Sequence, residues 1–148
     1  MISQKVKYAL RALVELARSG QSGETVMISQ IAEAQKVPKK FLEQILLELK
    51  RHGIVMSRRG KAGGYRLLKR PEDISFLDVM RIVDGPVAPL PCLSLTAYRR
   101  CEDCGDEGDC EIRRVFAKVA EATRRELANA TLASSLVGGD DLFGLENA

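Results

Sequence analysis

Apolar residues recur every three or four positions along the first third of the chain, which is the spacing of amphipathic helices. Ser3 is placed to cap the start of a first helix, and Gly20 is placed to stop it. After a polar loop, residues 28–37 repeat the pattern, and a third helix is predicted from Pro38 to Gly53. The apolar stripe expected on this third helix consists of Phe41, Ile45, Leu46 and Leu49.

The second and third predicted helices are separated by a short turn, which is the helix-turn-helix arrangement. In that arrangement the second helix enters the major groove of DNA with its N-terminal end first. Lysines at that end neutralise phosphates, and a glutamine amide pairs with a base edge. The DNA-contact residues predicted from this motif are Ser29, Pro38, Lys39, Lys40 and Gln44.

A basic hairpin is predicted directly after the third helix. Residues 54–57 and 65–67 alternate like strands, and the tip between them, RRGKAGG, is rich in glycine and cations. Three helices followed by such a hairpin describe a winged helix, in which Arg58, Arg59 and Lys61 would lie against a phosphate or in a minor groove. The alternative is a plain surface hairpin whose charges are only solvated.

The second half of the chain predicts one short helix and one long helix. Residues 75–84 begin at a serine cap and are stopped by Gly85 and the proline after it. A linker with three prolines follows in residues 86–91, and residues 111–135 then form an amphipathic helix. The apolar face of this long helix consists of Ile112, Val115, Phe116, Val119, Thr123 and Leu127.

A long helix with one apolar face commonly packs on its symmetry mate in a homodimer, although it can also fold back on its own chain. Dimerisation fits DNA binding, because helix-turn-helix dimers bind the two half-sites of a palindromic operator about one helical turn apart. The predicted fold is therefore mainly α: a winged helix-turn-helix with a long C-terminal dimerisation helix. Its expected parts are a winged-helix DNA-binding domain (1–85), a cysteine-rich sensor loop (86–110), the dimerisation helix (111–135) and a flexible tail (136–148).

The charge of the chain is divided unevenly between its halves. Residues 1–70 carry 15 Lys and Arg against 5 Asp and Glu, whereas residues 71–148 carry 8 against 15. The basic half indicates a polyanion such as double-stranded DNA as partner, although a solvated basic surface is also common. The chain has no long apolar run and its charged start does not resemble a signal peptide, so a cytoplasmic location without membrane contact is expected.

All four cysteines lie within residues 92–110, in a charged segment before the long helix. Thiolate is a soft ligand, and four cysteines complete either an iron–sulfur cluster or a tetrahedral zinc site. Cys101 and Cys104 are separated by two residues, which is the chelating spacing that both kinds of site favour. A metal-free thiol switch is the third alternative, whereas a structural disulfide is disfavoured where thiols stay reduced.

Catalysis is not expected from these cysteines. In thioredoxin-like enzymes the paired cysteines follow a strand and open a helix within a βαβ pattern, which this sequence lacks. The lone histidine, His52, lies far from them in sequence, in the last turn of the third predicted helix. A cation at that position interacts favourably with the helix dipole.

Three stretches of the chain resemble the Rrf-type winged-helix regulators, the family of the IscR, NsrR and RirA repressors. They are YALRALVELA, ISQIAEAQKVPKKFLEQILLELKRHGIV and RRGKAGGYRL. The resemblance covers roughly residues 1–135 and implies a dimeric DNA-binding transcription factor. In many members three cysteines before the dimerisation helix hold an iron–sulfur cluster that controls DNA binding. Carried over to this chain, the three are Cys92, Cys104 and Cys110.

Cys101 is additional to the family's three cysteines. The usual fourth ligands are a histidine just after the last cysteine or a carboxylate from the partner's first helix. This chain has Ile112 and Lys7 at those places, so Cys101 is the candidate fourth ligand. The resemblance thus implies a homodimeric repressor whose cofactor is an iron–sulfur cluster, of the two-iron or the four-iron type, with zinc as the alternative.

Overall fold

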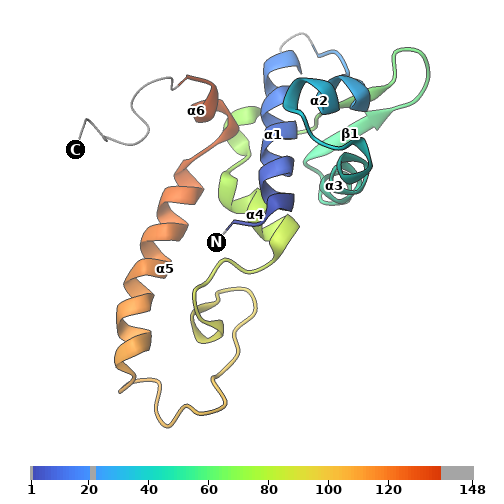
Figure 1. Ribbon diagram of the computed structural model, residues 1–148. Coiled ribbons are helices and arrows are strands. Elements are labelled where there is room, and N and C mark those ends of the chain that lie inside the picture. The colour runs from blue at the N-terminus through green and yellow to red at the C-terminus, as the bar shows by residue number, and fades with distance from the viewer. Residues whose placement is uncertain (1, 21–22, 138–148) are drawn as a thin grey trace.

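The structure is a computed structural model that describes residues 2–20 and 23–137. Figure 1 shows a helical N-terminal unit with a small hairpin on one side and a long helix on the other. The helices are α1 (Gln4–Ser19), α2 (Ile28–Gln35), α3 (Lys39–Arg51), α4 (Phe76–Asp84), α5 (Glu111–Asn129) and α6 (Leu132–Val137). The strands are β1 (Val55–Arg58) and β2 (Gly64–Leu67), and two 3₁₀ turns are η2 (Pro71–Asp73) and η3 (Pro91–Leu93). The predicted mainly α fold class is confirmed.

α1 forms the centre of the N-terminal unit, and α2, α3, α4 and α6 pack against it (Figure 1). Its buried side chains recur at helical spacing from Val6 to Ala17. The Val6 N–H donates to Ser3 Oγ at 3.1 Å, and Gly20 ends the helix. Both ends of α1 therefore lie where the sequence predicts them. Among the described residues, no helix combines the length and the apolar character that crossing a bilayer requires.

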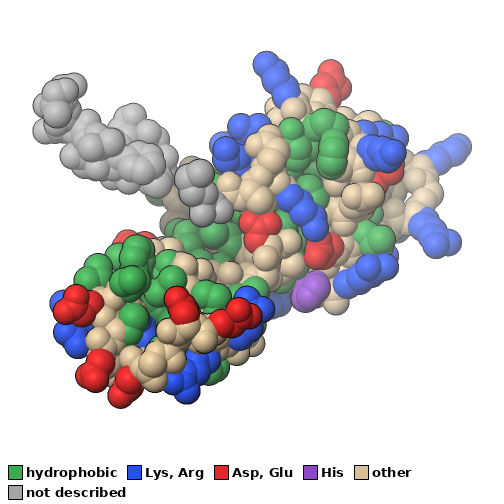
Figure 2. Space-filling model, turned by 60° about the horizontal axis from the view of Figure 1, so that its bottom comes forward, with side chains coloured by type: hydrophobic (Ala, Val, Ile, Leu, Met, Phe, Trp, Pro, Cys, Tyr) green, Lys and Arg blue, Asp and Glu red, His purple; other side chains and the backbone are tan. Residues whose placement is uncertain are grey.

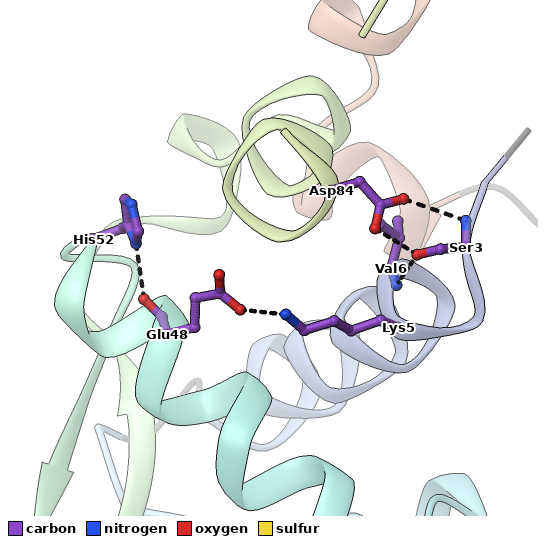
Figure 3. Close-up of polar contacts among 6 residues, drawn as sticks. All are labelled: Ser3, Lys5, Val6, Glu48, His52 and Asp84. Atoms are coloured by element: carbon purple, nitrogen blue, oxygen red, sulfur yellow. Dashed lines mark hydrogen bonds and ion pairs between the residues drawn. The ribbon is translucent and has the colours of Figure 1, made fainter. Parts of the chain in front are cut away.

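Polar contacts tie the first turn of α1 to α3 and α4 (Figure 3). Ser3 Oγ donates to Asp84 Oδ1 at 2.6 Å, at the C-terminal end of α4. Lys5 Nζ lies 2.6 Å from Glu48 Oε2 of α3. His52 follows the end of α3, and its Nδ1 lies 2.9 Å from the Glu48 carbonyl oxygen, so the ring occupies the helix C-terminus as predicted.

Three residues join α2 to α3. Lys36 adopts the left-handed conformation, with φ of 52°, and ends α2. Val37 is buried, and its N–H donates to the Ala32 carbonyl oxygen at 3.0 Å. Pro38 is the N-cap, so α3 begins at Lys39, one residue later than predicted. This turn confirms the predicted helix-turn-helix arrangement.

The buried stripe of α3 differs from the prediction at one position. Phe41 was expected in the core, but 56% of its surface is exposed. The stripe begins one residue later, and Phe41 falls beside it, where its ring packs on Tyr8 with 6.4 Å between ring centroids. The prediction for Phe41 is therefore wrong. The buried residues of α3 are Leu42, Ile45, Leu46 and Leu49.

The wing is an antiparallel hairpin of β1 and β2, in which Val55 lies opposite Leu67 and Arg58 lies opposite Gly64. The predicted hairpin is confirmed, with strand bounds that differ from the prediction by one residue. β1 and α3 also contact each other, which places the hairpin directly beside the helix-turn-helix.

Gly64 is required where β2 meets the segment before α2. Val26 and Tyr65 exchange two backbone hydrogen bonds of 2.8 Å each, which brings the Val26 carbonyl group against Gly64. The φ angle of Gly64 is +148°, and a Cβ atom at this residue would lie 2.4 Å from the Val26 carbonyl oxygen. Any side chain at this position would therefore push the wing away from α2.

We expect Gly64→Ala to lower the free energy of unfolding by about 2 kcal/mol, because it combines backbone strain with a clash against backbone atoms. Gly105→Ala is the matched control, since a Cβ atom there meets nothing within 4 Å. Urea unfolding of both variants at one protein concentration measures the difference. Equal stability of the two variants would show that the wing does not approach Val26 this closely.

The long C-terminal helix predicted for residues 111–135 is interrupted. α5 stops before Ala130, and α6 begins at Leu132. Between them the chain pairs with the residues around the start of α4. The Phe76 N–H donates to the Ala130 carbonyl oxygen at 2.8 Å, and the Leu132 N–H donates to the Ile74 carbonyl oxygen at 3.0 Å. The prediction of one continuous helix is wrong, because this pairing replaces helical hydrogen bonds.

α6 packs against α1 and η2, so the end of the predicted dimerisation segment belongs to the N-terminal unit. The side chain of Leu132 is fully buried in the same core as α1. Of the predicted flexible tail, residues 136–137 end α6, and residues 138–148 lie outside the described residues. The other predicted domain boundaries stay predictions.

The other described residues leave most of the surface of α5 exposed. It contacts α4 and η3, and Ala120 is its buried residue. Val119 and Thr123 of the predicted apolar face line a hollow beside α4, and Figure 2 shows hydrophobic side chains gathered on the surface of this part of the molecule. The large exposed side chains of this face, which we call the α5 stripe, are Ile112, Val115, Phe116 and Val119.

Candidate nucleic-acid interface and cysteine loop

The first turn of α2, the start of α3 and the wing meet around a hollow of about 480 Å³. Ser29 comes from α2, Lys39 from α3, and Arg58 and Arg59 from the hairpin. Four of the predicted DNA-contact residues therefore lie around one concave surface, which we call the wing groove. The helix-turn-helix positions the two walls formed by α2 and α3, and the Val26–Tyr65 pairing holds the wing beside them.

A second hollow, of about 700 Å³, shares Arg58 with the wing groove. Lys61 lines it, together with Gln30 of α2 and Arg66 of β2. Arg66 is held in place, because its Nη1 donates to the Gly23 carbonyl oxygen at 3.2 Å. The sequence prediction omitted Gln30 and Arg66. Side chains alternate between the two faces of a strand, and this alternation places Arg66 beside the basic tip. The alternation in the sequence could therefore have predicted Arg66 as a DNA contact.

Pro38, Lys40 and Gln44 are exposed but line neither hollow. Lys40 and Gln44 lie on α3 outside its buried stripe, so they remain predicted DNA contacts on an adjoining surface. Pro38 acts in the structure as the N-cap of α3. It sets the start of the helix whose N-terminal end carries the two lysines.

The cations of this surface are free of carboxylate partners within the described part of the chain. The ion pairs found there join Lys5 to Glu48, Arg70 to Asp73, Arg113 to Glu107 and Arg125 to Glu126. None of them includes a lysine or arginine of the wing groove. Figure 2 shows Lys and Arg side chains projecting from the N-terminal unit, with Asp and Glu more frequent at the opposite side. Unpaired cations beside a groove are suited to phosphate contacts.

We expect Arg59→Ala to weaken binding to all DNA sequences and to reduce the slope of log affinity against log salt by about 0.9, the value for one lost phosphate contact. Arg125→Ala is the control, because Arg125 lies on α5 and pairs with Glu126. Titrations of labelled duplex DNA at several salt concentrations measure the slope. An unchanged slope for Arg59→Ala would contradict the wing contact.

The four cysteines occupy the connection between α4 and α5, and all four are free thiols. Cys92 lies in η3 and is 5% exposed, whereas Cys101 and Cys104 are partly exposed in the loop after it. Cys110 is the N-cap of α5, and its Sγ accepts the Arg113 N–H at 3.4 Å. The loop therefore begins at a buried thiol and ends at the first turn of the long helix.

Backbone contacts fold this loop back on η3. The Arg99 N–H donates to the Pro91 carbonyl oxygen at 3.1 Å, and the Cys104 N–H donates to the Cys101 carbonyl oxygen at 3.3 Å. Burial raises the pKa of the Cys101 thiol above its ordinary value, and the neighbouring Cys92 thiol raises it further.

A polar network closes the other side of the loop. Tyr98 donates its hydroxyl to Glu107, which raises the pKa of Tyr98 above its ordinary value. Arg113 Nη2 lies 4.0 Å from Glu107 Oε2, so the same carboxylate connects the loop to α5. Arg100 Nη2 donates to the carbonyl oxygens of Cys104 and Gly105 at 3.2 and 2.8 Å. Arg100 and Arg113 thus hold the loop together.

The predicted metal ligands share one loop but do not converge on one point. Within the part of the chain that the structure describes, no three His, Cys, Asp or Glu side chains form a set able to hold a metal ion. The donor chemistry does fit, because Cys101 interacts with both Cys92 and Cys104, and thiolates are the ligands of iron–sulfur clusters and structural zinc. A bound metal centre would require the four thiols to move closer together.

Nearly the whole chain matches one family model. The Rrf2 model, described as an iron-dependent transcriptional regulator, covers residues 2–137. The chain belongs to the Rrf2 family. An rrf2-like HTH-type transcriptional regulator of Rhodobacter capsulatus is 49% identical over 142 residues, which are 95% of this chain and 95% of the relative.

Solved structures similar to this Rrf2-family chain include two regulators. CymR of B. subtilis, called the global cysteine regulator, has a TM-score of 0.77 and 27% identity, covering 95% of this chain and 98% of its own. IscR of T. potens has a TM-score of 0.71 and 28% identity, covering 92% and 85%. These likenesses confirm the winged-helix fold. They also confirm the prediction of a DNA-binding transcriptional regulator rather than an enzyme.

Proposed function

We propose that this Rrf2-family protein is a homodimeric repressor, acting in the cytoplasm, whose affinity for a palindromic operator is controlled by an iron–sulfur cluster. Cys92, Cys101, Cys104 and Cys110 would hold the cluster. The observation that carries this proposal is the position of Cys110. It caps α5, so a candidate ligand and the helix with the exposed apolar stripe belong to the same element.

The α5 stripe supports the homodimer. Four large apolar side chains on one face of a helix of 19 residues are at least 40% exposed within the described residues. Packing this face against its copy in a second chain would remove the apolar surface from water. A two-fold axis through α5 would then set the spacing between two wing grooves, which is the geometry that a palindromic operator requires.

The cysteine loop supports control of that spacing. A bound cluster would link the thiolates through redox-sensitive bonds. Without the cluster, only the loop holds these thiols near one another. The Arg113 N–H donates to Cys110 Sγ, and the Glu107–Arg113 contact connects the loop to the first turn of α5. Drawing Cys110 toward Cys92 would therefore pull on α5, and a small shift of α5 would misalign the two half-sites.

The protein purified without oxygen tests the proposal through its visible spectrum and its iron, sulfide and zinc content. We expect brown protein with iron and sulfide in matching amounts, and a colourless form after Cys104→Ser. Colourless protein with one zinc per chain would show that the cysteines hold a structural zinc ion and not a cluster. Colourless, metal-free protein would contradict any resident metal centre and leave thiol oxidation as the means of control.

A further inference from the structure

The tip of the wing consists of residues 59–63, which lie between β1 and β2 at the outer end of the hairpin (Figure 1). It carries Arg59 and Lys61, two of the predicted DNA contacts. The Gly63 N–H donates to the Gly60 carbonyl oxygen at 2.9 Å, which closes the tip as a turn. This local bond fixes the shape of the tip, but it does not decide how the tip is oriented on the rest of the molecule.

One side chain from outside the hairpin reaches the wing tip. Thr25 lies in the segment between α1 and α2, and its Oγ1 donates to the Ala62 carbonyl oxygen at 2.6 Å. Within the described ranges, no other hydrogen bond joins residues 59–63 to a segment outside the hairpin. The Thr25 hydroxyl therefore ties the tip to the N-terminal unit at the residue directly after Lys61.

The backbone on both sides of Thr25 is itself fixed on β2. Val26 exchanges two backbone hydrogen bonds with Tyr65, and the Gly23 carbonyl oxygen accepts from Arg66 Nη1 at 3.2 Å. Thr25 thus reaches the tip from a segment that is anchored at two other points. A hydroxyl on such a fixed base restricts the tip to one orientation.

We propose that Thr25 is a positioning residue that holds the wing tip, and with it Arg59 and Lys61, in the orientation that meets DNA. Without the bond from Thr25, the tip samples several orientations in the free protein, and DNA binding has to order it. A binding surface whose cations are already ordered avoids this entropic cost. The inference rests on the predicted contact between the wing and DNA, and it is independent of the cluster.

Thr25→Val tests the proposal, because valine keeps the branched shape of threonine and lacks the hydroxyl. The full chain, purified without oxygen, is titrated at several salt concentrations with a labelled duplex that the wild-type protein selects from a random library. We expect Thr25→Val to bind about three- to tenfold more weakly, the range that one hydrogen bond between neutral groups contributes to an equilibrium. The slope of log affinity against log salt is expected to stay at the wild-type value, because every cation is still present.

Thr25→Ser is the matched control, because serine keeps the hydroxyl, and it is expected to restore wild-type affinity. Limited digestion with trypsin then reports on the tip without DNA. Trypsin cleaves after arginine and lysine, and cleavage at Arg59 and Lys61 requires the tip to open. We expect faster cleavage of the tip in Thr25→Val than in the wild type or Thr25→Ser, with unchanged cleavage elsewhere in the chain.

Wild-type affinity or wild-type cleavage of Thr25→Val would overturn the proposal. Equal losses in Thr25→Val and Thr25→Ser would also overturn it, because the hydroxyl would not be responsible. Thr25→Ala lacks the hydroxyl too and repeats the test if valine disturbs folding. Failure of the wing contact itself is distinguishable, since it leaves the salt slope of Arg59→Ala unchanged, whereas failure of this inference alone leaves the Arg59→Ala effect intact.

Discussion

Leu132→Ala is expected to lower the free energy of unfolding by about 2–5 kcal/mol, the usual cost of removing a fully buried leucine side chain. Leu132 is 0% exposed and lies in the core that surrounds α1, although it comes from α6 near the end of the described chain. The loss is expected to be large because the pairing of Leu132 with Ile74 fixes the backbone and limits collapse of the cavity.

Val137→Ala is the control for this prediction. Val137 ends the same helix and is 87% exposed, so its replacement is expected to change stability by less than about 0.5 kcal/mol. Both variants are compared by chemical denaturation at one protein concentration, because association of two chains adds to the apparent stability. A Leu132→Ala variant as stable as the wild type would mean that α6 does not dock on the N-terminal unit.

Val115→Glu is expected to convert the proposed dimer to monomers and to lower affinity for operator DNA about 100-fold or more. Val115 lies in the α5 stripe, and a two-fold interface would bring two copies of the new carboxylate into one apolar contact. The affinity falls because two linked DNA-binding units gain roughly 10²–10⁴ over one unit without any new contact.

Ala128→Glu is the matched control, because Ala128 is exposed on α5 outside the stripe and the substitution adds the same charge. It is expected to remain dimeric and to bind DNA with nearly wild-type affinity. Light scattering reports the mass in solution, and titration of a labelled duplex reports the affinity. A Val115→Glu protein that stays dimeric would place the dimer contact elsewhere.

The N-terminal unit could be predicted from the sequence because local rules decide it. Ser3 caps α1, Gly20 ends it, and Pro38 sets the start of α3 within one residue. The error at Phe41 has a local origin as well, because Phe41 lies at the edge of the face formed by Leu42, Ile45, Leu46 and Leu49 rather than within it. The Gly-rich wing was predicted from its residue types, but the steric reason for Gly64 depends on Val26, which is distant in sequence.

The C-terminal half was predicted less completely because contacts across the chain decide it. Thr131 caps the start of α6, because its Oγ1 accepts the Ser134 N–H at 3.1 Å, and the interruption depends as well on pairing with Ile74 and Phe76. The sequence identified Cys101 as an additional thiol. It could not show that Cys92 is its neighbour, because the Arg99–Pro91 hydrogen bond determines that proximity.

The most direct test of the account compares DNA affinity before and after the metal centre is removed. A duplex is selected from a random library with anaerobically purified protein, and its affinity is measured at one salt concentration for that protein and for protein stripped by a chelator. Coupling between two sites typically amounts to about 5–150-fold in affinity, and a difference in this range is the result we predict. Equal affinity of the two forms would contradict control of DNA binding by the cysteine loop.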